Sequence, residues 1–274
     1  EFPFNEGRLC PKGVQRYLQN NHPDRILSPL QRVEGKGFEP IDWESAMSRT
    51  VSEIKRIQAA YGNDAFAMLS GVSLTNEKSY MIGKFARVAL KTANLDYNGR
   101  LCMVSAGAGN KKAFGLDRIS NSWADLEHAK VVMICGTNVS ETFPTLTHYI
   151  WQARDNGAKL IVVDPRVTPI ARTADLHLPV KPGTDSALYG AMLKILVDND
   201  WLDHDFIDNH TSGFQETIDA VKNYDLPWAE KVTGIPAAKI LEAATLWGKA
   251  STSFLLHARG IEHHSKGVDN VVGC

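Results

Sequence analysis

The sequence has no long apolar run and no excess of charge of either sign, and each shortage excludes a class of protein. Its longest uninterrupted apolar stretches, residues 131–135 and 160–163, fall far short of the roughly 20 residues needed to cross a bilayer, so no membrane insertion is expected. Lys and Arg number 30 against 31 Asp and Glu, which removes the electrostatic case for nucleic acid as a main partner. What remains is a globular chain of 274 residues, 43% hydrophobic, with room for about two domains.

Cysteine is scarce and scattered. Cys10, Cys102, Cys135 and Cys274 stand far apart, and no CxxC pair is present. This spacing is unlike the disulfide framework of a small secreted domain, so a reduced compartment is favoured and any metal chemistry must use single cysteines. The chain opens on Glu1 without a basic and apolar signal pattern, and we expect it to be a fragment.

Apolar periodicity predicts alternating strands and helices. A helix is expected over residues 42–62, capped by Asp42 and ended by Gly62, whereas residues 1–40 are too interrupted by proline for a long element. The predicted strands cover residues 65–69, 130–135, 159–163, 176–180 and 254–257. The other predicted helices cover residues 75–89, 144–154, 185–197, 227–232 and 236–247. The order predicts an α/β fold of Rossmann-like parallel sheets flanked by helices.

Glycine and charged residues follow the predicted strands, at the edge where ligands bind in such sheets. Gly136 and Gly183 allow a ligand to approach the backbone, Asp164 and Asp185 can accept from ribose or guanine donors, and Arg166 can bind phosphate. Considered alone, each of these loop segments is equally typical of an ordinary turn. The sequence has no GxGxxG motif, the fingerprint of Rossmann-type dinucleotide binding. These residues alone predict that the protein binds a nucleotide-like ligand. A nucleotide-binding module with no redox role is one interpretation of them.

Two cysteine-containing segments carry a family resemblance. The segment GRLCPKG around Cys10 resembles the one that carries the fourth cysteine of the 4Fe-4S cluster in molybdopterin-dependent oxidoreductases. The segment NGRLCM around Cys102 is similar to the one that presents the molybdenum ligand in that family. The stretches after the predicted strands resemble its contacts to molybdopterin guanine dinucleotide. A thiolate is a soft donor suited to both metals, so the resemblance implies separate roles for the two cysteines.

The resemblance implies two cofactors, molybdenum bis(molybdopterin guanine dinucleotide) and a 4Fe-4S cluster, and a set of site residues. Lys12 resembles a lysine between cluster and pterin, and it is assigned with Cys102 to catalysis and electron transfer. The implied cofactor-binding residues are Gly136, Thr137, Asn138, Asp164, Pro165, Arg166, Gly183, Thr184, Asp185, Gly260 and His264. His263 and His264 are equally well explained as a polar loop, and Cys135 as a buried core residue.

The resemblance also implies a domain order. Residues 1–40 would be the tail of a small iron-sulfur domain, 41–100 a first α/β segment of a discontinuous cofactor-binding domain, and 101–274 a second α/β domain that binds the dinucleotide. Three further cluster cysteines and another nucleotide-binding domain are absent, so the fragment alone is expected to be inactive.

Met103 and the late stretch ARGIEHHSKGVDN resemble assimilatory nitrate reductases. Formate dehydrogenases of the same fold usually place a His where Met103 stands, and they are the first alternative. Electrons would pass from the cluster by way of Lys12 and the pterin to molybdenum on Cys102, which would reduce nitrate to nitrite. A ferredoxin, a flavoprotein or a cytochrome would supply them. The assimilatory resemblance favours the cytoplasm, with the periplasm as the alternative.

An alternative of another class is a molybdenum-free electron-transfer or scaffold subunit of a respiratory complex. Such a subunit would have no need of the Cys102 segment, and metal analysis separates the two readings.

Overall fold

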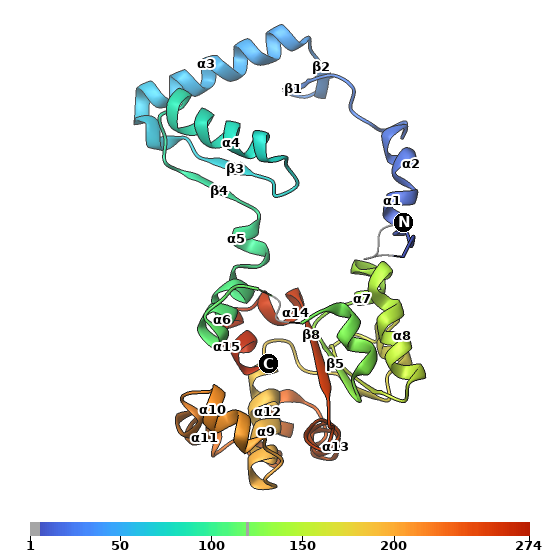
Figure 1. Ribbon diagram of the computed structural model, residues 1–274. Coiled ribbons are helices and arrows are strands. Elements are labelled where there is room, and N and C mark those ends of the chain that lie inside the picture. The colour runs from blue at the N-terminus through green and yellow to red at the C-terminus, as the bar shows by residue number, and fades with distance from the viewer. Residues whose placement is uncertain (1–5, 119–120) are drawn as a thin grey trace. The chain divides into compact units, whose positions relative to one another are not determined.

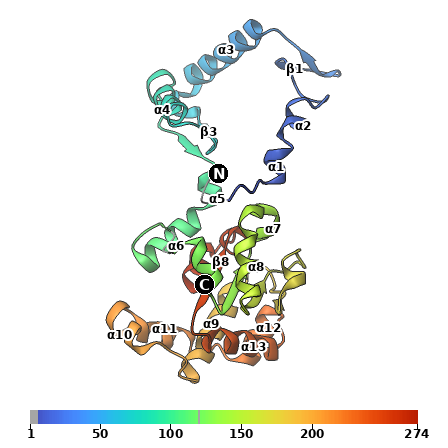
Figure 2. The same ribbon diagram turned by 45° about the vertical axis from the view of Figure 1, so that its right-hand side comes forward.

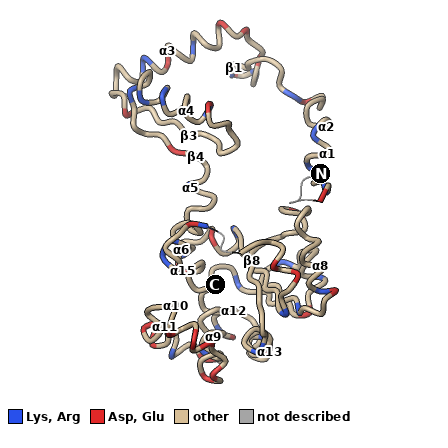
Figure 3. Tube along the Cα trace, viewed as in Figure 1, with Lys and Arg blue, Asp and Glu red and all other residues tan. Residues whose placement is uncertain are grey.

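The computed structural model describes residues 6–118 and 121–274 (Figure 1). The chain divides into two compact units, which we describe separately. The sheet unit comprises Cys102–Cys274 with the segment that ends at Cys10, and the N-terminal unit is Pro11–Leu101. Basic and acidic side chains occur along both units (Figure 3). None of the described helices combines the length and apolar character needed to span a membrane.

A four-stranded parallel sheet forms the centre of the sheet unit, and it confirms the predicted α/β class (Figures 1 and 2). The strand order is β7-β6-β5-β8. The bounds of these strands are β5 Val131–Cys135, β6 Lys159–Val163, β7 Leu176–Leu178 and β8 Ser253–His257. Every residue of β5 is buried, as expected for a central parallel strand covered on both faces.

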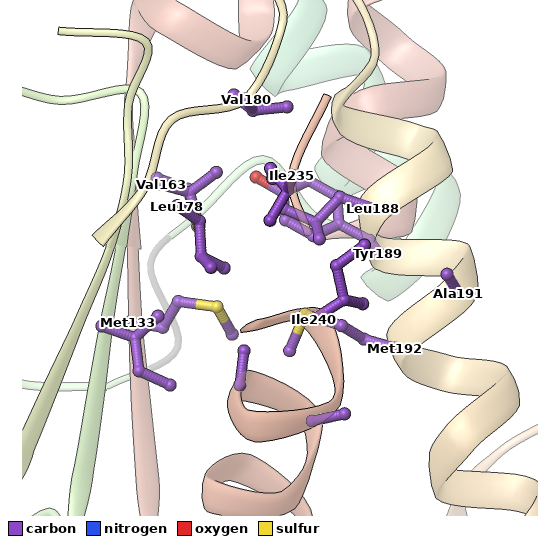
Figure 4. Packing of buried hydrophobic residues seen from close by; sticks show 14 of the residues in the cluster. Met133, Val163, Leu178, Val180, Leu188, Tyr189, Ala191, Met192, Ile235 and Ile240 are labelled. Carbon is purple, nitrogen blue, oxygen red and sulfur yellow. The ribbon is translucent and has the colours of Figure 1, made fainter. Parts of the chain in front are cut away.

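Alternate strand residues pack into two apolar clusters, one on each face of the sheet. On one face, Val163 and Leu178 lie in a cluster with Leu188 and Ile240 from the flanking helices (Figure 4). On the other face, Leu160 joins a cluster with residues of the helix that follows β5. Each such fully buried side chain contributes roughly 1.5–3 kcal/mol of transfer free energy, so these clusters hold the sheet unit together.

Helices surround this sheet and connect its strands. Between β5 and β6 the chain forms α7 Val139–Thr142 and α8 Thr147–Asp155. The helix predicted at residues 144–154 therefore begins later, because Pro144–Leu146 form a 3-10 turn first. The remaining helices of the unit are α6 Val104–Phe114, α9 Asp185–Asp198, α10 His204–His210, α11 Phe214–Val221, α12 Leu226–Thr233, α13 Ala237–Gly248, α14 Arg259–Glu262 and α15 Gly267–Gly273.

The N-terminal unit has a long helix, α3 Trp43–Tyr61, as predicted. The carboxylate of Asp42 accepts the Ser45 amide at 2.8 Å, and Gly62 ends the helix at a φ of 86°. Its other elements are α1 Pro11–Val14, α2 Arg16–Asn20, β1 Leu30–Val33, β2 Gly37–Pro40, β3 Met68–Ser70, α4 Asn76–Lys84 and β4 Leu95–Tyr97. The short helix α5 Gly99–Cys102 leads to the sheet unit.

Two sequence predictions in this unit need correction. The strand predicted at residues 65–69 begins only at Met68, because residues 63–65 form a 3-10 turn. The helix predicted at residues 75–89 is α-helical only to Lys84 and continues as a π-helical turn, Phe85–Ala89. Residues 1–40 contain a short antiparallel hairpin, β1 with β2, which the proline pattern did not predict.

Candidate functional site at the carboxyl edge of the sheet

The loops after β5 and β8 cross at the carboxyl edge of the sheet. The strand order reverses between these neighbouring strands, since β6 and β7 lie on one side of β5 and β8 lies on the other, while all four strands stay parallel. Crevices at such switch points are where α/β sheets bind ligands. The Gly260 amide donates to the Gly136 carbonyl oxygen at 2.8 Å. A Cβ on Gly260 would lie 2.5 Å from the Cα of Gly136, so neither position has room for a side chain.

Buried polar residues follow Gly136. Thr137 and Asn138 are buried, although they lie in a loop at the edge of the sheet. The Asn138 side-chain oxygen accepts from the Ser140 hydroxyl at 3.1 Å, and the Asn138 carbonyl accepts from the amides of the following turn. These hydrogen bonds hold the loop in one conformation, and a loop that binds a ligand through its backbone needs such a fixed shape.

Asp164 organises the loop after β6. Its carboxylate is buried and accepts the Arg166 amide at 2.8 Å, which makes a tight turn through Pro165. The guanidinium of Arg166 lies 3.8 Å from the same carboxylate, and its side chain is largely exposed. The turn therefore presents a positive charge at the rim of the edge, where a phosphate would find a partner.

Asp185 begins α9 and faces the same edge. Burial raises the pKa of Asp185 above its ordinary value, and the charge of Asp164 adds to the rise, while the Asp185 amide and the charge of His264 act against it. His264 donates through Nε2 to the Gly260 carbonyl at 2.7 Å. Next to Asp185, Thr184 bonds to the Lys181 carbonyl at 2.7 Å.

Gly183 adopts a φ of 84° in this loop, a conformation that favours glycine. A Cβ there would point toward His264, 3.9 Å from Nδ1. The edge therefore gathers Gly136, Asp164, Asp185, Gly260 and His264 from four separate stretches of chain. Whether they bind a cofactor stays a prediction.

Cys102, at the end of α5, lies against the segment that follows β8. Nε2 of His263 donates to the Cys102 carbonyl at 2.8 Å, and the Arg259 guanidinium lies beside the Cys102 side chain. Burial alone would lower the pKa of Arg259, but the neighbouring Cys102 side chain and the charge of Glu262 outweigh burial and raise it. The Cys102 side chain thus has a cationic group beside it.

Arg259 and Glu262 are site residues that sequence reasoning missed. Both lie in the stretch ARGIEHHSKGVDN, in which only Gly260 and His264 were assigned a role. The available signal was a pair of opposite charges three residues apart, the spacing that brings two side chains together on one helical turn.

Cys10 and Lys12 were also predicted as site residues. Cys10 is half-buried in the sheet unit, whereas Lys12 lies in α1 of the N-terminal unit. Their roles beside a cluster stay predictions. Cys135 is buried in the core, as predicted, and burial with a hydrogen bond to Cys274 raises the pKa of its thiol.

The side chains around Cys102 fit a metal that takes one ligand from the protein and its other ligands from a bound cofactor. Within residues 6–118 and 121–274, no group of three or more His, Cys, Asp or Glu side chains is placed to hold a metal ion. A metal on Cys102 would receive a single soft sulfur from these residues, and its other ligands must come from a bound organic group. The side-chain-free edge at Gly136 and Gly260 suits the close approach of such a group.

Comparisons with known proteins bear on this reading. The sequence matches the family described as Molybdopterin oxidoreductase over residues 25–272. It is 39% identical over 272 residues to the assimilatory nitrate reductase catalytic subunit of Bacillus subtilis (strain 168), covering 99% of this chain and 38% of that protein. It is 36% identical over 272 residues to the F420-dependent formate dehydrogenase 2 subunit alpha of Methanococcus maripaludis, covering 99% of this chain and 40% of that protein.

A solved structure is also similar. Acetylene hydratase from Pelobacter acetylenicus matches with a TM-score of 0.74 and 26% identity, covering 97% of this chain and 36% of that one. The chain therefore spans well under half the length of each of these relatives.

Proposed function

Because this chain belongs to the molybdopterin oxidoreductase family, we propose that it is part of the catalytic subunit of a nitrate reductase, and that Cys102 is the molybdenum ligand. The observation that carries the proposal is the position of Cys102 against the segment after β8. His263 of this segment donates to the Cys102 carbonyl, Arg259 lies beside the Cys102 side chain, and Gly260 forms part of the glycine-lined edge. Nitrate is favoured as substrate by the 39% identity to an assimilatory nitrate reductase subunit over 99% of the chain.

In this proposal, molybdopterin guanine dinucleotide lies along the carboxyl edge of the sheet. Gly136, Gly183 and Gly260 would admit it close to the backbone, and Arg166 would bind a phosphate. The carboxylates of Asp164 and Asp185 would accept from guanine or ribose donors. Molybdenum with pterin sulfurs supplies two-electron redox chemistry, and the protein supplies position and charge.

Electron supply is the part of the proposal that rests on resemblance alone. Cys10 would bind one iron of a 4Fe-4S cluster, and Lys12 would lie between cluster and pterin. A donor such as a ferredoxin, a flavoprotein or a cytochrome, and a cytoplasmic location, complete the proposal.

Formate oxidation is the second candidate, because the Methanococcus maripaludis relative named as a formate dehydrogenase is 36% identical over the same span. The two candidates share the family and the cofactor and differ in substrate. They are separated by assaying one protein with both substrates.

The test uses the full-length parent protein, expressed with molybdate and purified. We expect molybdenum, iron and viologen-driven reduction of nitrate. A protein that contains molybdenum and oxidises formate but does not reduce nitrate would overturn the assignment of nitrate as substrate. A protein that contains iron but no molybdenum would favour an electron-transfer subunit.

The Cys102→Ala variant tests the ligand assignment in the same preparation. Turnover should fall to background while the iron-sulfur signal persists, because only the molybdenum loses a ligand. The Cys135→Ala variant is the matched control, since Cys135 is a core thiol and should leave turnover intact. Turnover retained by Cys102→Ala contradicts the assignment.

A further inference from the structure

A buried carboxylate lies directly behind the arginine that faces Cys102. The side chain of Glu262, at the end of α14, is only 1% exposed. An isolated carboxylate is costly to bury, and in proteins such groups are paired with a charge or hydrogen-bonded. Glu262 is neither a predicted cofactor contact nor a metal ligand, so its burial needs another explanation.

The side chains of Arg259 and His257 approach Glu262 from one end of the sheet. Oε2 forms an ion pair with the Arg259 guanidinium, and Oε1 lies 3.3 Å from Nδ1 of His257, the last residue of β8. This His257 nitrogen forms no well-directed hydrogen bond with the described residues, although it lies close to the carboxylate. Burial alone would raise the pKa of Glu262, but the contacts with His257 and Arg259 outweigh burial and keep the pKa below its ordinary value.

The backbone that carries Glu262 is fixed independently of its side chain. The Asn270 side chain donates to the Ile261 carbonyl at 2.9 Å and also accepts from the Ser186 hydroxyl. Gly267 packs so closely on the Glu262 carbonyl that a Cβ there would lie 2.0 Å from its oxygen. Removing the charge of Glu262 should therefore leave the turn in place.

A chain of contacts thus runs from the core to the sulfur: His257, Glu262, Arg259 and Cys102. The Arg259 guanidinium is planar and carries several N–H donors. A carboxylate that binds one side of the guanidinium leaves the N–H groups on its other side able to contact a second partner. In this structure the Cys102 side chain lies beside the same guanidinium.

We propose that Glu262, supported by His257, is a positioning residue that holds the Arg259 guanidinium against the side chain of Cys102. Glu262 touches neither the sulfur nor any reacting atom and acts only through Arg259. The inference rests on the proposed function in one respect, that Cys102 carries the molybdenum, and it is independent of whether nitrate or formate is the substrate.

The test compares Glu262→Gln, Arg259→Gln and the double variant in the full-length enzyme. Glutamine keeps the shape of Glu262 and removes its charge. We expect both single variants to load molybdenum normally and to change the electron paramagnetic resonance spectrum of the molybdenum. Arg259→Gln removes a direct neighbour of the metal ligand and should lower kcat/KM by roughly tenfold or more, and Glu262→Gln, one step further out, should lower it by no more than that.

The double variant decides whether Glu262 acts through Arg259. If it does, the double variant should be no worse in kcat/KM than Arg259→Gln alone, because the two changes remove the same interaction. Losses that multiply would overturn the proposal. Glu262→Asp retains the charge and should recover most of the wild-type spectrum.

Asp175→Asn is the matched control. Asp175 is also a paired carboxylate, 3.0 Å from the Lys159 ammonium, but Lys159 begins β6 and the pair lies at the amino edge of the sheet. This variant should leave the spectrum and kcat/KM unchanged. An equal effect of Asp175→Asn would mean that any lost ion pair disturbs the site.

A structure of the Glu262→Gln protein covers the case in which that variant fails to load molybdenum. The proposal predicts that the Arg259 guanidinium moves away from Cys102, and an unmoved guanidinium overturns it. Wild-type protein without molybdenum would contradict the proposed function, whereas loaded wild type with an unaltered Glu262→Gln variant contradicts only this inference.

Discussion

The two units use the same kind of apolar pattern with opposite results. In the sheet unit, every residue of β5 is buried, and helices cover both faces of the sheet. In the N-terminal unit, α3 has a regular apolar stripe but none of its 19 residues is buried, and Trp43 is 69% exposed. Apolar periodicity thus predicts the type of an element, whereas burial depends on whether another element lies opposite. Among the described residues, the two large apolar clusters lie in the sheet unit, and they support the loops of the candidate site.

The largest expected effect comes from removing a core side chain of the sheet unit. Leu160 is a fully buried residue of β6, and Leu160→Ala should lower the free energy of unfolding by about 2–5 kcal/mol, because it leaves a cavity between sheet and helix. Leu69→Ala is the matched substitution in β3, where the side chain is 71% exposed, and it should change stability by less than about 0.5 kcal/mol. Chemical denaturation of the 274-residue chain measures both, and similar losses would remove the contrast between the units.

A smaller effect is expected at the crossing of the two glycine loops. Gly260→Ala should destabilise the sheet unit by about 1–3 kcal/mol, because the new Cβ would clash with the backbone of Gly136. Gly71→Ala, in the N-terminal unit, meets nothing within 4 Å and serves as control. Thermal unfolding distinguishes them, and an unaltered Tm for Gly260→Ala would show that the loops do not pack as closely as described.

The smallest effect concerns the charge of Asp185. Because burial raises its pKa in the folded state, the folded protein holds the proton more tightly than the unfolded chain, and stability falls as pH rises through the raised pKa. Asp185→Asn should therefore be more stable than wild type at neutral pH, and the difference should narrow as the pH falls toward 3.8, the ordinary value. Melting curves between pH 8 and 5 test this sign, and a difference that widens on acidification contradicts it.

Local signals in the sequence predicted elements in both units. Uninterrupted apolar runs place β5 and β6 of the sheet unit, and the Asp42 cap and Gly62 terminator place the ends of α3 in the N-terminal unit. These features depend on neighbours within a few residues. Because strands and helices alternate along the chain, few sheet topologies are possible. The sequence therefore also predicted that the strands of the sheet are parallel.

Contacts between distant parts of the chain were not predictable in this way. Arg259 and Cys102 are far apart in sequence, and only the fold brings the guanidinium to the sulfur. The burial of Glu262 likewise follows from the packing of α14 on α15, which no periodicity encodes. In the candidate site, sequence patterns identified the loops, and the structure was needed to identify which charges support the cysteine.

X-ray absorption at the molybdenum edge tests the central claim, that Cys102 is the metal ligand, most directly. The full-length protein and its Cys102→Ser variant would be compared at equal molybdenum content. We predict that the variant loses one sulfur from the shell around molybdenum and gains a lighter neighbour. An identical sulfur shell in both proteins would contradict the account.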